Sequence, residues 1–330
     1  MNRRDGIIAL GALSLSIGSS YALAQAKRRN LPARVATLDD APEAARAPLW
    51  ATFRKRLTEL GYADGTEIIF EQRWAGGNLE KLPNLAAELV ALNPDIIVTV
   101  TTTAALAVQK ATSRIPIVAI GPADPVKSGL VASLGRPGGN VTGLSPNQAE
   151  IAGKWLEIVR EIVPRAKSLA YLTDRGNPGE MLVFRELEGR ARRLGLEVQA
   201  MDGLTKGNVE HAFASIERDR VDALIVATTA SLLGQRQQIV ESAARLRLPA
   251  VYARKEYPEE GGLLSYGTDA GPLFSRAAEY VDRILKGAYP SELPFEMAST
   301  FTLVVNMKTA RALGVTIPQS VLVRADQVIQ

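Results

Sequence analysis

The sequence predicts an α/β protein of two lobes, each built around a doubly wound parallel sheet. Short apolar runs rich in β-branched residues alternate with amphipathic segments of helical length, which is the pattern of parallel α/β architecture. This order occurs twice along the chain, and the two halves resemble each other locally. The length of 330 residues is enough for about two domains, each with its own core.

In the first half, the pattern predicts five strands separated by helices. The expected strands are Arg34–Leu38, Glu67–Glu71, Asp95–Val100, Pro116–Ile120 and Val141–Leu144. The helices expected between them include Leu49–Leu60, Leu79–Leu92 and Thr103–Ser113. Gly61 and the pair Asn93–Pro94 supply the signals that end the first two helices.

The second half repeats this alternation. Its expected strands are Ser168–Leu172, Leu196–Met201, Asp222–Ala227, Pro249–Ala253 and Gly262–Ser265. The expected helices include Gln148–Ile162, Glu180–Leu194 and Ser231–Leu246. A helix over Gly271–Lys286 and a strand over Thr300–Asn306 are expected to follow them.

The two halves are similar in one stretch that joins a strand to a helix. Asp95–Thr103 aligns with Asp222–Ala230, an offset of 222 − 95 = 127 residues. In open parallel sheets, ligands bind beyond the carboxyl ends of the strands. Two such sheets that face each other enclose a cleft, so the sequence predicts a site for a small molecule between the lobes.

The composition excludes several kinds of chemistry. The chain has no Cys, which rules out disulfides, thiol catalysis and iron–sulfur clusters, and its only His is His211. It contains neither a nucleotide-binding glycine fingerprint nor a G-x-S-x-G elbow. The 39 basic residues mostly alternate with the 35 acidic ones, whereas a nucleic-acid surface would need a stripe of one sign. We therefore expect no enzyme activity, no cofactor, no metal and no nucleic-acid partner.

Residues 1–26 have the order of a secretory signal peptide. A basic start at Arg3–Arg4 precedes an apolar run over Ile7–Ile17 and a small-x-small cleavage site at Ala22–Ala24. An N-terminal membrane anchor is the alternative interpretation. The arginine pair also resembles a twin-arginine signal, and the choice between the two export routes stays open. We expect the mature chain to be exported to the periplasm.

Polar residues gather where the predicted strands end. Thr101, Thr102 and Thr103 follow a strand at the start of a helix, where backbone N–H groups favour a carboxylate or phosphate. Simple helix capping is the alternative. Thr228 and Thr229 repeat the arrangement in the second half. The other candidates at or near strand ends are Asp39, Asp124, Asp174, Asn177, Tyr252, Tyr266 and Asp269. The acidic groups suit an ammonium or sugar hydroxyls, and the aromatic rings could stack on a ligand.

Segments along the whole mature chain resemble the ABC-transporter substrate-binding proteins of the tryptophan/tyrosine-transporter type. The similarity is carried by Leu60–Tyr62, Glu71–Ala75, Pro94–Val98, Ile115–Val118, Asp124–Val126, Arg136–Gly143, Gly261–Gly267, Ala277–Gly287 and Leu313–Pro318. The family commonly has Gly-Thr-Pro where this chain has Thr101-Thr102-Thr103, which makes the loop here more polar.

This resemblance implies a type I periplasmic-binding-protein fold, in which a hinge of three crossovers closes two lobes on a small ligand. It places Thr102, Asp124, Tyr266 and Asp269 in the cleft. It also implies a membrane permease with its ATPase as partner, and a monomeric receptor. The expected lobes are residues 31–145 with 268–292, and residues 146–267 with 293–330.

The expected function is that of an exported solute-binding receptor of an ABC importer. The ligand is expected to be an amino acid or a related carboxylate. Its carboxylate would lie at Thr101–Thr103, and Asp124 or Asp269 would receive its ammonium. The alternatives are an exported ligand sensor, an enzyme that uses the same cleft, and the effector domain of a transcription regulator, which would need a helix-turn-helix near residue 1.

Overall fold

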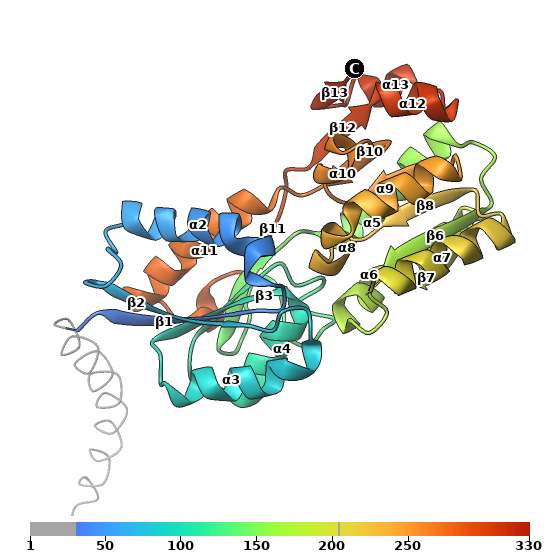
Figure 1. The fold of residues 1–330 in the computed structure, drawn as a ribbon. Coiled ribbons are helices and arrows are strands. Elements are labelled where there is room, and N and C mark those ends of the chain that lie inside the picture. The colour runs from blue at the N-terminus through green and yellow to red at the C-terminus, as the bar shows by residue number, and fades with distance from the viewer. Residues whose placement is uncertain (1–30, 204) are drawn as a thin grey trace, which may run out of the picture.

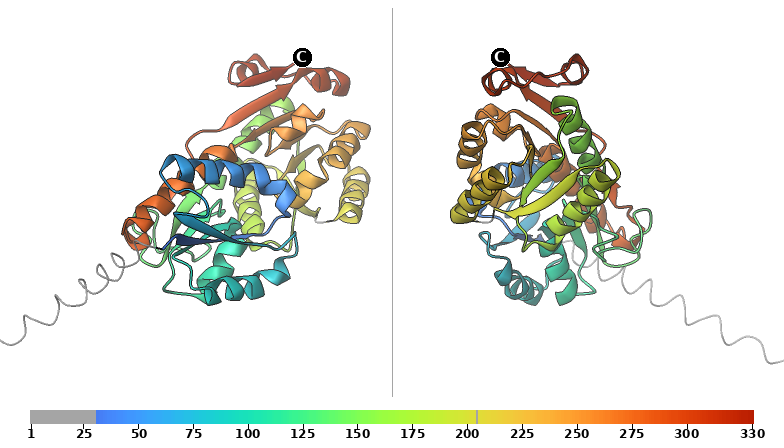
Figure 2. Two further views of the ribbon diagram at one scale, coloured as in Figure 1. Left: turned by 60° about the vertical axis from the view of Figure 1, so that its left-hand side comes forward. Right: turned by 90° about the vertical axis from the view of Figure 1, so that its right-hand side faces the viewer.

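The computed structural model describes residues 31–203 and 205–330, which form two α/β lobes (Figures 1 and 2). The predicted signal peptide lies outside the described residues. Within the part of the chain that the structure describes, no helix combines the length and apolar character needed to cross a membrane. The two-lobed α/β class predicted from the sequence is confirmed.

The first lobe has a six-stranded sheet in the order β11-β5-β4-β3-β1-β2, and all of its strands are parallel. Its strands are β1 (Ala33–Asp39), β2 (Ile68–Trp74), β3 (Ile96–Val100), β4 (Ile117–Ile120), β5 (Val141–Ser145) and β11 (Glu296–Met297). Its helical elements are α2 (Glu43–Glu59), η1 (Leu79–Lys81), α3 (Leu82–Ala91), α4 (Thr101–Ala111), α11 (Ala270–Leu285) and η2 (Pro290–Glu292).

Helices cover both faces of this sheet. Successive residues of a strand point to opposite faces, so Ile96 packs under α2 and α11 while Ile97 packs under α3 and α4. Both residues are fully buried, as are Phe53 of α2 and Leu89 of α3. The continuous apolar run of β3 is therefore the consequence of burial on two sides.

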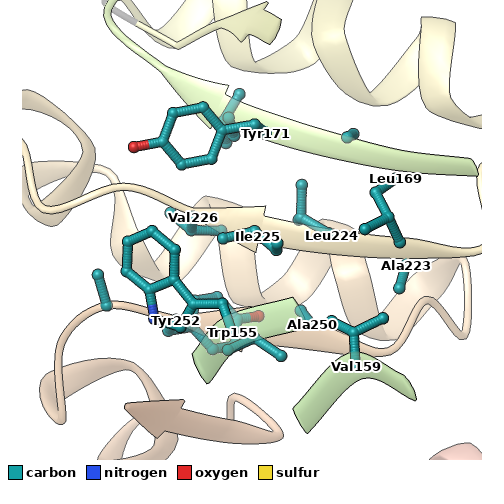
Figure 3. Packing of buried hydrophobic residues seen from close by; sticks show 14 of the residues in the cluster. Trp155, Val159, Leu169, Tyr171, Ala223, Leu224, Ile225, Val226, Ala250 and Tyr252 are labelled. Atoms are coloured by element: carbon teal, nitrogen blue, oxygen red, sulfur yellow. The ribbon is translucent and has the colours of Figure 1, made fainter. Parts of the chain in front are cut away.

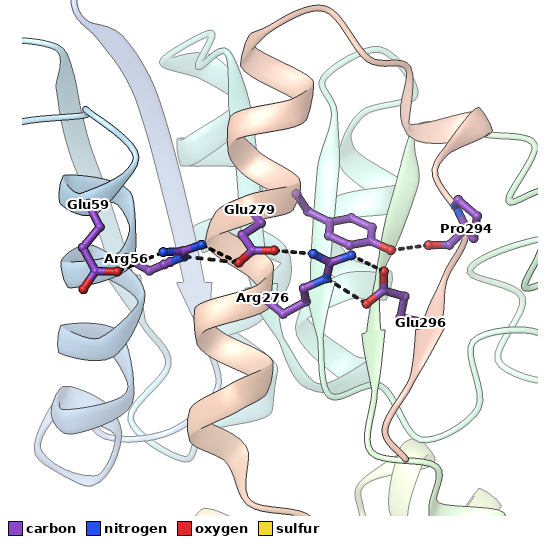
Figure 4. Close-up of polar contacts among 7 residues, drawn as sticks. Arg56, Glu59, Arg276, Glu279, Pro294 and Glu296 are labelled. Atoms are coloured by element: carbon purple, nitrogen blue, oxygen red, sulfur yellow. Dashed lines mark hydrogen bonds and ion pairs between the residues drawn. The ribbon is translucent and has the colours of Figure 1, made fainter. Parts of the chain in front are cut away.

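A ladder of ion pairs joins α2, α11 and β11 on the outside of the first lobe (Figure 4). Arg56 of α2 lies 2.8 Å from a carboxylate oxygen of Glu279 on α11. Arg276, one turn earlier on α11, also pairs with Glu279 and lies 2.7 Å from Glu296 on β11. The ladder therefore helps to hold β11 against the helices of the first lobe.

The second lobe has a seven-stranded sheet in the order β13-β12-β10-β9-β8-β6-β7, in which only the β10–β12 pair is antiparallel. Its strands are β6 (Ser168–Thr173), β7 (Glu197–Asp202), β8 (Ala223–Val226), β9 (Ala250–Tyr252), β10 (Leu264–Gly267), β12 (Thr302–Asn306) and β13 (Gln327–Ile329). In both lobes, the first five strands of the lobe are arranged in the order 2-1-3-4-5. The repeated segments therefore belong to equivalent strands, β3 and β8.

The second lobe has one large core around its sheet. Its helices are α5 (Gln148–Ile162), α6 (Pro178–Arg193), α7 (Lys206–Asp219), α8 (Ala230–Gly234), α9 (Arg236–Arg245), α10 (Glu256–Glu259), α12 (Met307–Leu313) and α13 (Gln319–Leu322). Trp155 of α5 and Tyr171 of β6 lie in this core, with their ring centres 6.2 Å apart, near Ile225 of β8 (Figure 3). The indole N–H of Trp155 donates to the carbonyl of Tyr266 at 2.7 Å, which ties α5 to the end of β10.

The chain passes between the lobes after β5, after β10 and after β11. The third passage corrects one predicted boundary. Residues 293–330 were expected in the second lobe, but β11 pairs with β5 in the first sheet, so the crossover follows Met297. A strand of two residues has too short a pattern to be recognised, which is why the sequence did not indicate it.

Two of the differences between the predicted and the observed elements have a local structural reason. The helix expected over Ser231–Leu246 is two helices, α8 and α9, because Gln235 between them has a non-helical ψ of 13°. The strand expected at Gly262 begins at Leu264 instead. At Gly262, an added Cβ would lie 2.7 Å from the Tyr252 ring and 2.9 Å from the Tyr257 carbonyl, so this glycine permits a close approach before the strand.

Candidate ligand-binding site

A cavity of about 750 Å³ lies between the two lobes and is lined by residues of both. Its walls are formed where parallel strands end, since β1 leads to Asp40, β3 to Thr101, β6 to Asp174 and β8 to Thr228. These are the carboxyl ends of strands in each sheet, the position at which open α/β sheets bind ligands. The folding of each lobe therefore brings polar strand-end residues to one shared space.

The lobes touch each other beside this cavity. Lys127 of the first lobe lies 3.4 Å from Glu186 of the second. Ala123, in the loop after β4, packs into the core cluster of the second lobe. Gly179, at the start of α6, lies so close to Thr102 of α4 that an added Cβ would stand 2.7 Å from the Thr102 hydroxyl. The structure therefore has the lobes closed on this side.

Six of the predicted site residues line the cavity: Thr101, Thr102, Asp174, Asn177, Thr228 and Thr229. Several of them also serve the local fold. The Thr102 hydroxyl accepts from the backbone N–H of Ala123 at 3.0 Å. The side chain of Asn177 caps α6, and that of Thr229 caps α8.

The four predicted acidic and threonine residues outside the cavity lining have local partners. Asp39 is buried and accepts from the indole N–H of Trp50 at 2.9 Å. The Thr103 hydroxyl lies 3.1 Å from that of Thr101. Asp124 accepts from the backbone N–H of Lys127, and Asp269 caps α11. The two expected ammonium acceptors, Asp124 and Asp269, are therefore helix or turn caps at the edge of the cleft.

The two predicted aromatic residues do not line the cavity either. Tyr252 is fully buried, and its ring stacks on that of Tyr257 with the ring centres 4.5 Å apart. Tyr266 stacks on Phe301 at 5.6 Å and faces the C-terminal part of the second lobe. Both lie in strands, where successive side chains point to opposite faces of the sheet, so closeness to a strand end does not direct a side chain into the cavity.

Sequence reasoning missed several cavity residues, which are Arg46, Gln148, Trp155, Glu180 and Phe274. Asp40 lies beside the predicted Asp39, and the alternation of the strand decides which of the two carboxylates faces the cavity. Glu180 has the sequence position of an ordinary acidic residue in the first turn of a helix. Arg46 and Phe274 come from helices of the first lobe, and only the tertiary structure brings them to the site.

Three carboxylates in the cavity wall have raised pKa values. Burial raises the pKa of Asp40 to about 6, against the opposing effect of the Arg46 charge. Burial also raises the pKa of Glu180 to about 7, and the negative charges of Asp174 and Asp40 add to that rise. The pKa of Asp174 is raised by burial as well. Among the described residues, no group of His, Asp and Glu side chains is arranged to hold a metal ion.

Thr101 has a backbone conformation that β-branched residues rarely adopt. Its φ is +75°, in the left-handed region that favours glycine. Its hydroxyl donates to Asp40 Oδ2 at 2.9 Å. The resemblance implies glycine at this position, and Thr101 here has a glycine-like backbone with an added hydroxyl that holds a buried carboxylate.

We expect Thr101→Gly to be more stable than Thr101→Ala by about 1 kcal/mol, since an L-residue in the left-handed region costs about 1–2 kcal/mol. Both variants lose the hydroxyl, so the comparison isolates the backbone. At an ordinary helix position the order is reversed, with alanine favoured by about 1 kcal/mol. Urea unfolding of both variants measures the difference. A more stable alanine variant would contradict the strained backbone.

The comparisons with known proteins agree with this geometry. The model of the family described as "ABC transporter substrate binding protein" matches residues 44–329. A relative from Clostridioides difficile (strain R20291), named tyrosine-binding protein, is 27% identical over 261 residues, which are 79% of this chain and 75% of the relative.

Two solved structures are also similar over most of the chain. A conserved domain protein from Vibrio cholerae has a TM-score of 0.83 at 29% identity and covers 90% of this chain and 100% of its own. The ABC domain in complex with L-Trp from Streptococcus pneumonia has a TM-score of 0.81 at 27% identity, with 91% and 100% covered. This chain belongs to the family of ABC transporter substrate binding proteins.

Proposed function

We propose that this protein is the exported receptor of an ABC importer and that it captures an amino acid between its lobes. The observation that carries the proposal is the cavity lined from both lobes. A ligand that contacts both lobes binds the closed state better than the open one, and so shifts the population toward closure. The relatives from Clostridioides difficile and Streptococcus pneumonia, named for or crystallised with tyrosine and tryptophan, support an amino acid as the ligand class.

The start of α4 is the proposed place for the ligand carboxylate. This helix has 11 residues, and no side chain caps its first turn. The first N–H groups of a helix have no acceptor within the helix, and the helix dipole favours an anion there. Thr101 and Thr102 of this turn line the cavity.

The apolar part of the cavity is the proposed place for the ligand side chain. Ile120, Leu273 and Phe274 line it from the first lobe, and Ile151 and Trp155 from the second. Apolar walls with a few placed polar groups are typical of small-molecule sites, and aromatic rings are suited to stacking. We therefore favour a large apolar or aromatic side chain over a small one.

The remaining parts of the proposal concern the cell. We propose that the predicted signal peptide directs the chain to the periplasm, by the general secretory or the twin-arginine route, and that the chain acts there as a monomer. A membrane permease with its ATPase would recognise the closed form and accept the ligand. We propose no catalytic role, because members of this family are binding proteins.

A thermal-shift screen of residues 27–330 against amino acids, sugars, purines and small carboxylates tests the proposal. A ligand at 100 times its Kd stabilises the folded protein by about 2.7 kcal/mol. For a protein of this size we expect a Tm rise of about 5 °C or more from at least one amino acid. Shifts confined to sugars or purines would overturn the amino-acid assignment and leave the receptor role.

A further inference from the structure

The cavity wall carries an excess of acidic side chains. Asp40, Asp174 and Glu180 line it as buried carboxylates, and Arg46 and Arg254 are the arginines among its lining residues. Arg254 pairs with the side chain of Glu256, outside the cavity lining. The lining therefore contains three buried carboxylates but only one arginine that is not paired elsewhere. This excess of negative charge favours a ligand that carries a positive charge.

Asp40 offers this space one oxygen atom that lacks a hydrogen bond. Its Oδ2 accepts from the Thr101 hydroxyl at 2.9 Å, which fixes the direction of the carboxylate. Its Oδ1 lies 3.7 Å from the Arg46 guanidinium and is buried without a hydrogen-bond donor. The residue is only 8% exposed, so bulk water does not replace the missing donor.

Glu180 presents a similar oxygen from the opposite lobe. Its Oε2 accepts from the Tyr171 hydroxyl at 3.0 Å and from the Thr173 hydroxyl at 3.1 Å. These two donors hold the carboxylate at the cavity wall, while Oε1 receives no hydrogen bond from any described residue. The residue is 8% exposed. The buried Oε1 of Gln148, also in the cavity wall, lacks a partner too.

All three of these oxygen atoms are acceptors, so a ligand that satisfies them must donate hydrogen bonds. Asp40 and Glu180 line the same cavity from opposite lobes, and the negative charge of Asp40 adds to the raised pKa of Glu180. Two carboxylates in the wall of one cavity repel each other when both are ionised. A cation between them removes that repulsion and donates to both.

We propose that Asp40 of the first lobe and Glu180 of the second form a subsite for a charged amino group, and that an ammonium bound there bridges the lobes. This inference rests on the proposed function and names the group that receives the amino end of the ligand. It replaces Asp124 and Asp269, which the fold uses as caps. Thr101 acts as a positioning residue, because it holds the Asp40 carboxylate.

The subsite also makes binding depend on pH. The groups that face Asp40 are Arg46, Asp39 and Thr101, and those that face Glu180 are Tyr171, Thr173, Asp174 and Asp40, with Asp202 beside Asp174. Because burial raises the pKa of both carboxylates, the ligand-free site holds a proton near pH 6. An ammonium must displace that proton, so we expect the affinity to fall as the pH is lowered from 8 to 6.

The test compares L-tyrosine with 3-(4-hydroxyphenyl)propionate, which lacks the amino group, and with tyramine, which lacks the carboxylate. We expect calorimetric titration to show the propionate binding at least about 30-fold more weakly than tyrosine, since leaving a buried charge unpaired costs about 2 kcal/mol or more. Asp40→Asn and Glu180→Gln should each weaken tyrosine binding at least about tenfold. Asp269→Asn is the matched control, because asparagine caps a helix as well as aspartate does.

The outcomes separate this inference from the proposed function. Equal binding of tyrosine and the propionate, or full affinity in both variants, would overturn the subsite and leave the amino-acid receptor. Binding of tyramine without any amino acid, lost in both variants, would support the subsite and overturn the amino-acid assignment. If none of the three compounds binds and no amino acid in the thermal-shift screen raises the Tm, both the subsite and the proposed function are overturned.

Discussion

At pH 8, Glu180→Gln is expected to make the ligand-free protein more stable than the parent by about 3 kcal/mol. Glu180 is buried, and its pKa rises from 4.5 to about 7 on folding. Glutamine has the same shape, and its carbonyl oxygen can still accept from Tyr171 and Thr173. The substitution therefore removes the cost of a buried charge and keeps the hydrogen bonds.

The sign of the pH dependence follows from this shift. Between pH 4.5 and 7 the folded state binds a proton that the unfolded state releases, so the parent gains stability as the pH falls. Above pH 7 the cost of the buried charge is complete. We expect the advantage of the glutamine variant to be largest at pH 8 and to vanish near pH 4.5.

Melting temperatures between pH 4.5 and 8 measure this effect, with Asp124→Asn as a control that changes a carboxylate outside the cavity lining. Parallel curves for Glu180→Gln and the parent would show that Glu180 does not carry the raised pKa. The same variant is expected to bind tyrosine more weakly. The charge of Glu180 is thus expected to lower the stability of the fold and to bind the amino group of the ligand.

The architecture of the lobes was predictable because it rests on periodic burial. Five of the six strands of the first sheet were predicted, and helix α5 was predicted at Gln148–Ile162 as found. The alternation of apolar strands and amphipathic helices can be recognised within short segments of the sequence. The repeat around Asp95 and Asp222 predicted that the second lobe has the same architecture as the first. β11 was missed because two residues carry no periodicity.

The site was less predictable than the fold, for a geometric reason. Strand ends were identified correctly at Thr101, Asp174 and Thr228, because the topology alone places them at the cleft. Which side chain at a strand end faces inward depends on a shift of one residue. Asp39 and Asp40 both follow the first strand, but only Asp40 lines the cavity. Gln148 and Phe274 come from helices whose orientation is set by packing, which the sequence pattern does not specify.

The second large effect is expected at Gly179, where the lobes contact each other. An added Cβ would stand 2.7 Å from the Thr102 hydroxyl and 3.0 Å from its Cβ. The hydroxyl cannot turn away at no cost, since it accepts the backbone N–H of Ala123. Gly179→Ala therefore pushes α4 and α6 apart when the lobes close.

Overfilling a packed contact costs about 1–3 kcal/mol. The contact with Thr102 imposes this cost on the closed arrangement, whereas the milder contact with Asn177 Oδ1, at 3.2 Å, lies within the second lobe. Ligand affinity should therefore fall about tenfold to a hundredfold in Gly179→Ala, and further in Gly179→Val. Titration calorimetry with the ligand from the thermal-shift screen measures the loss. Small-angle scattering should show that the variant contracts less on ligand addition than the parent does.

Gly189 supplies the matched control, because it lies in the same helix and an added Cβ there would meet nothing within 4 Å. Gly189→Ala should raise the stability of the protein by about 1 kcal/mol through helix propensity and leave the affinity unchanged. Parent-like affinity and contraction in Gly179→Ala would mean that the ligand-bound lobes do not meet at Thr102. Loss of affinity at Gly179 alone would identify the contact between α4 and α6 as part of the closed state that the ligand stabilises.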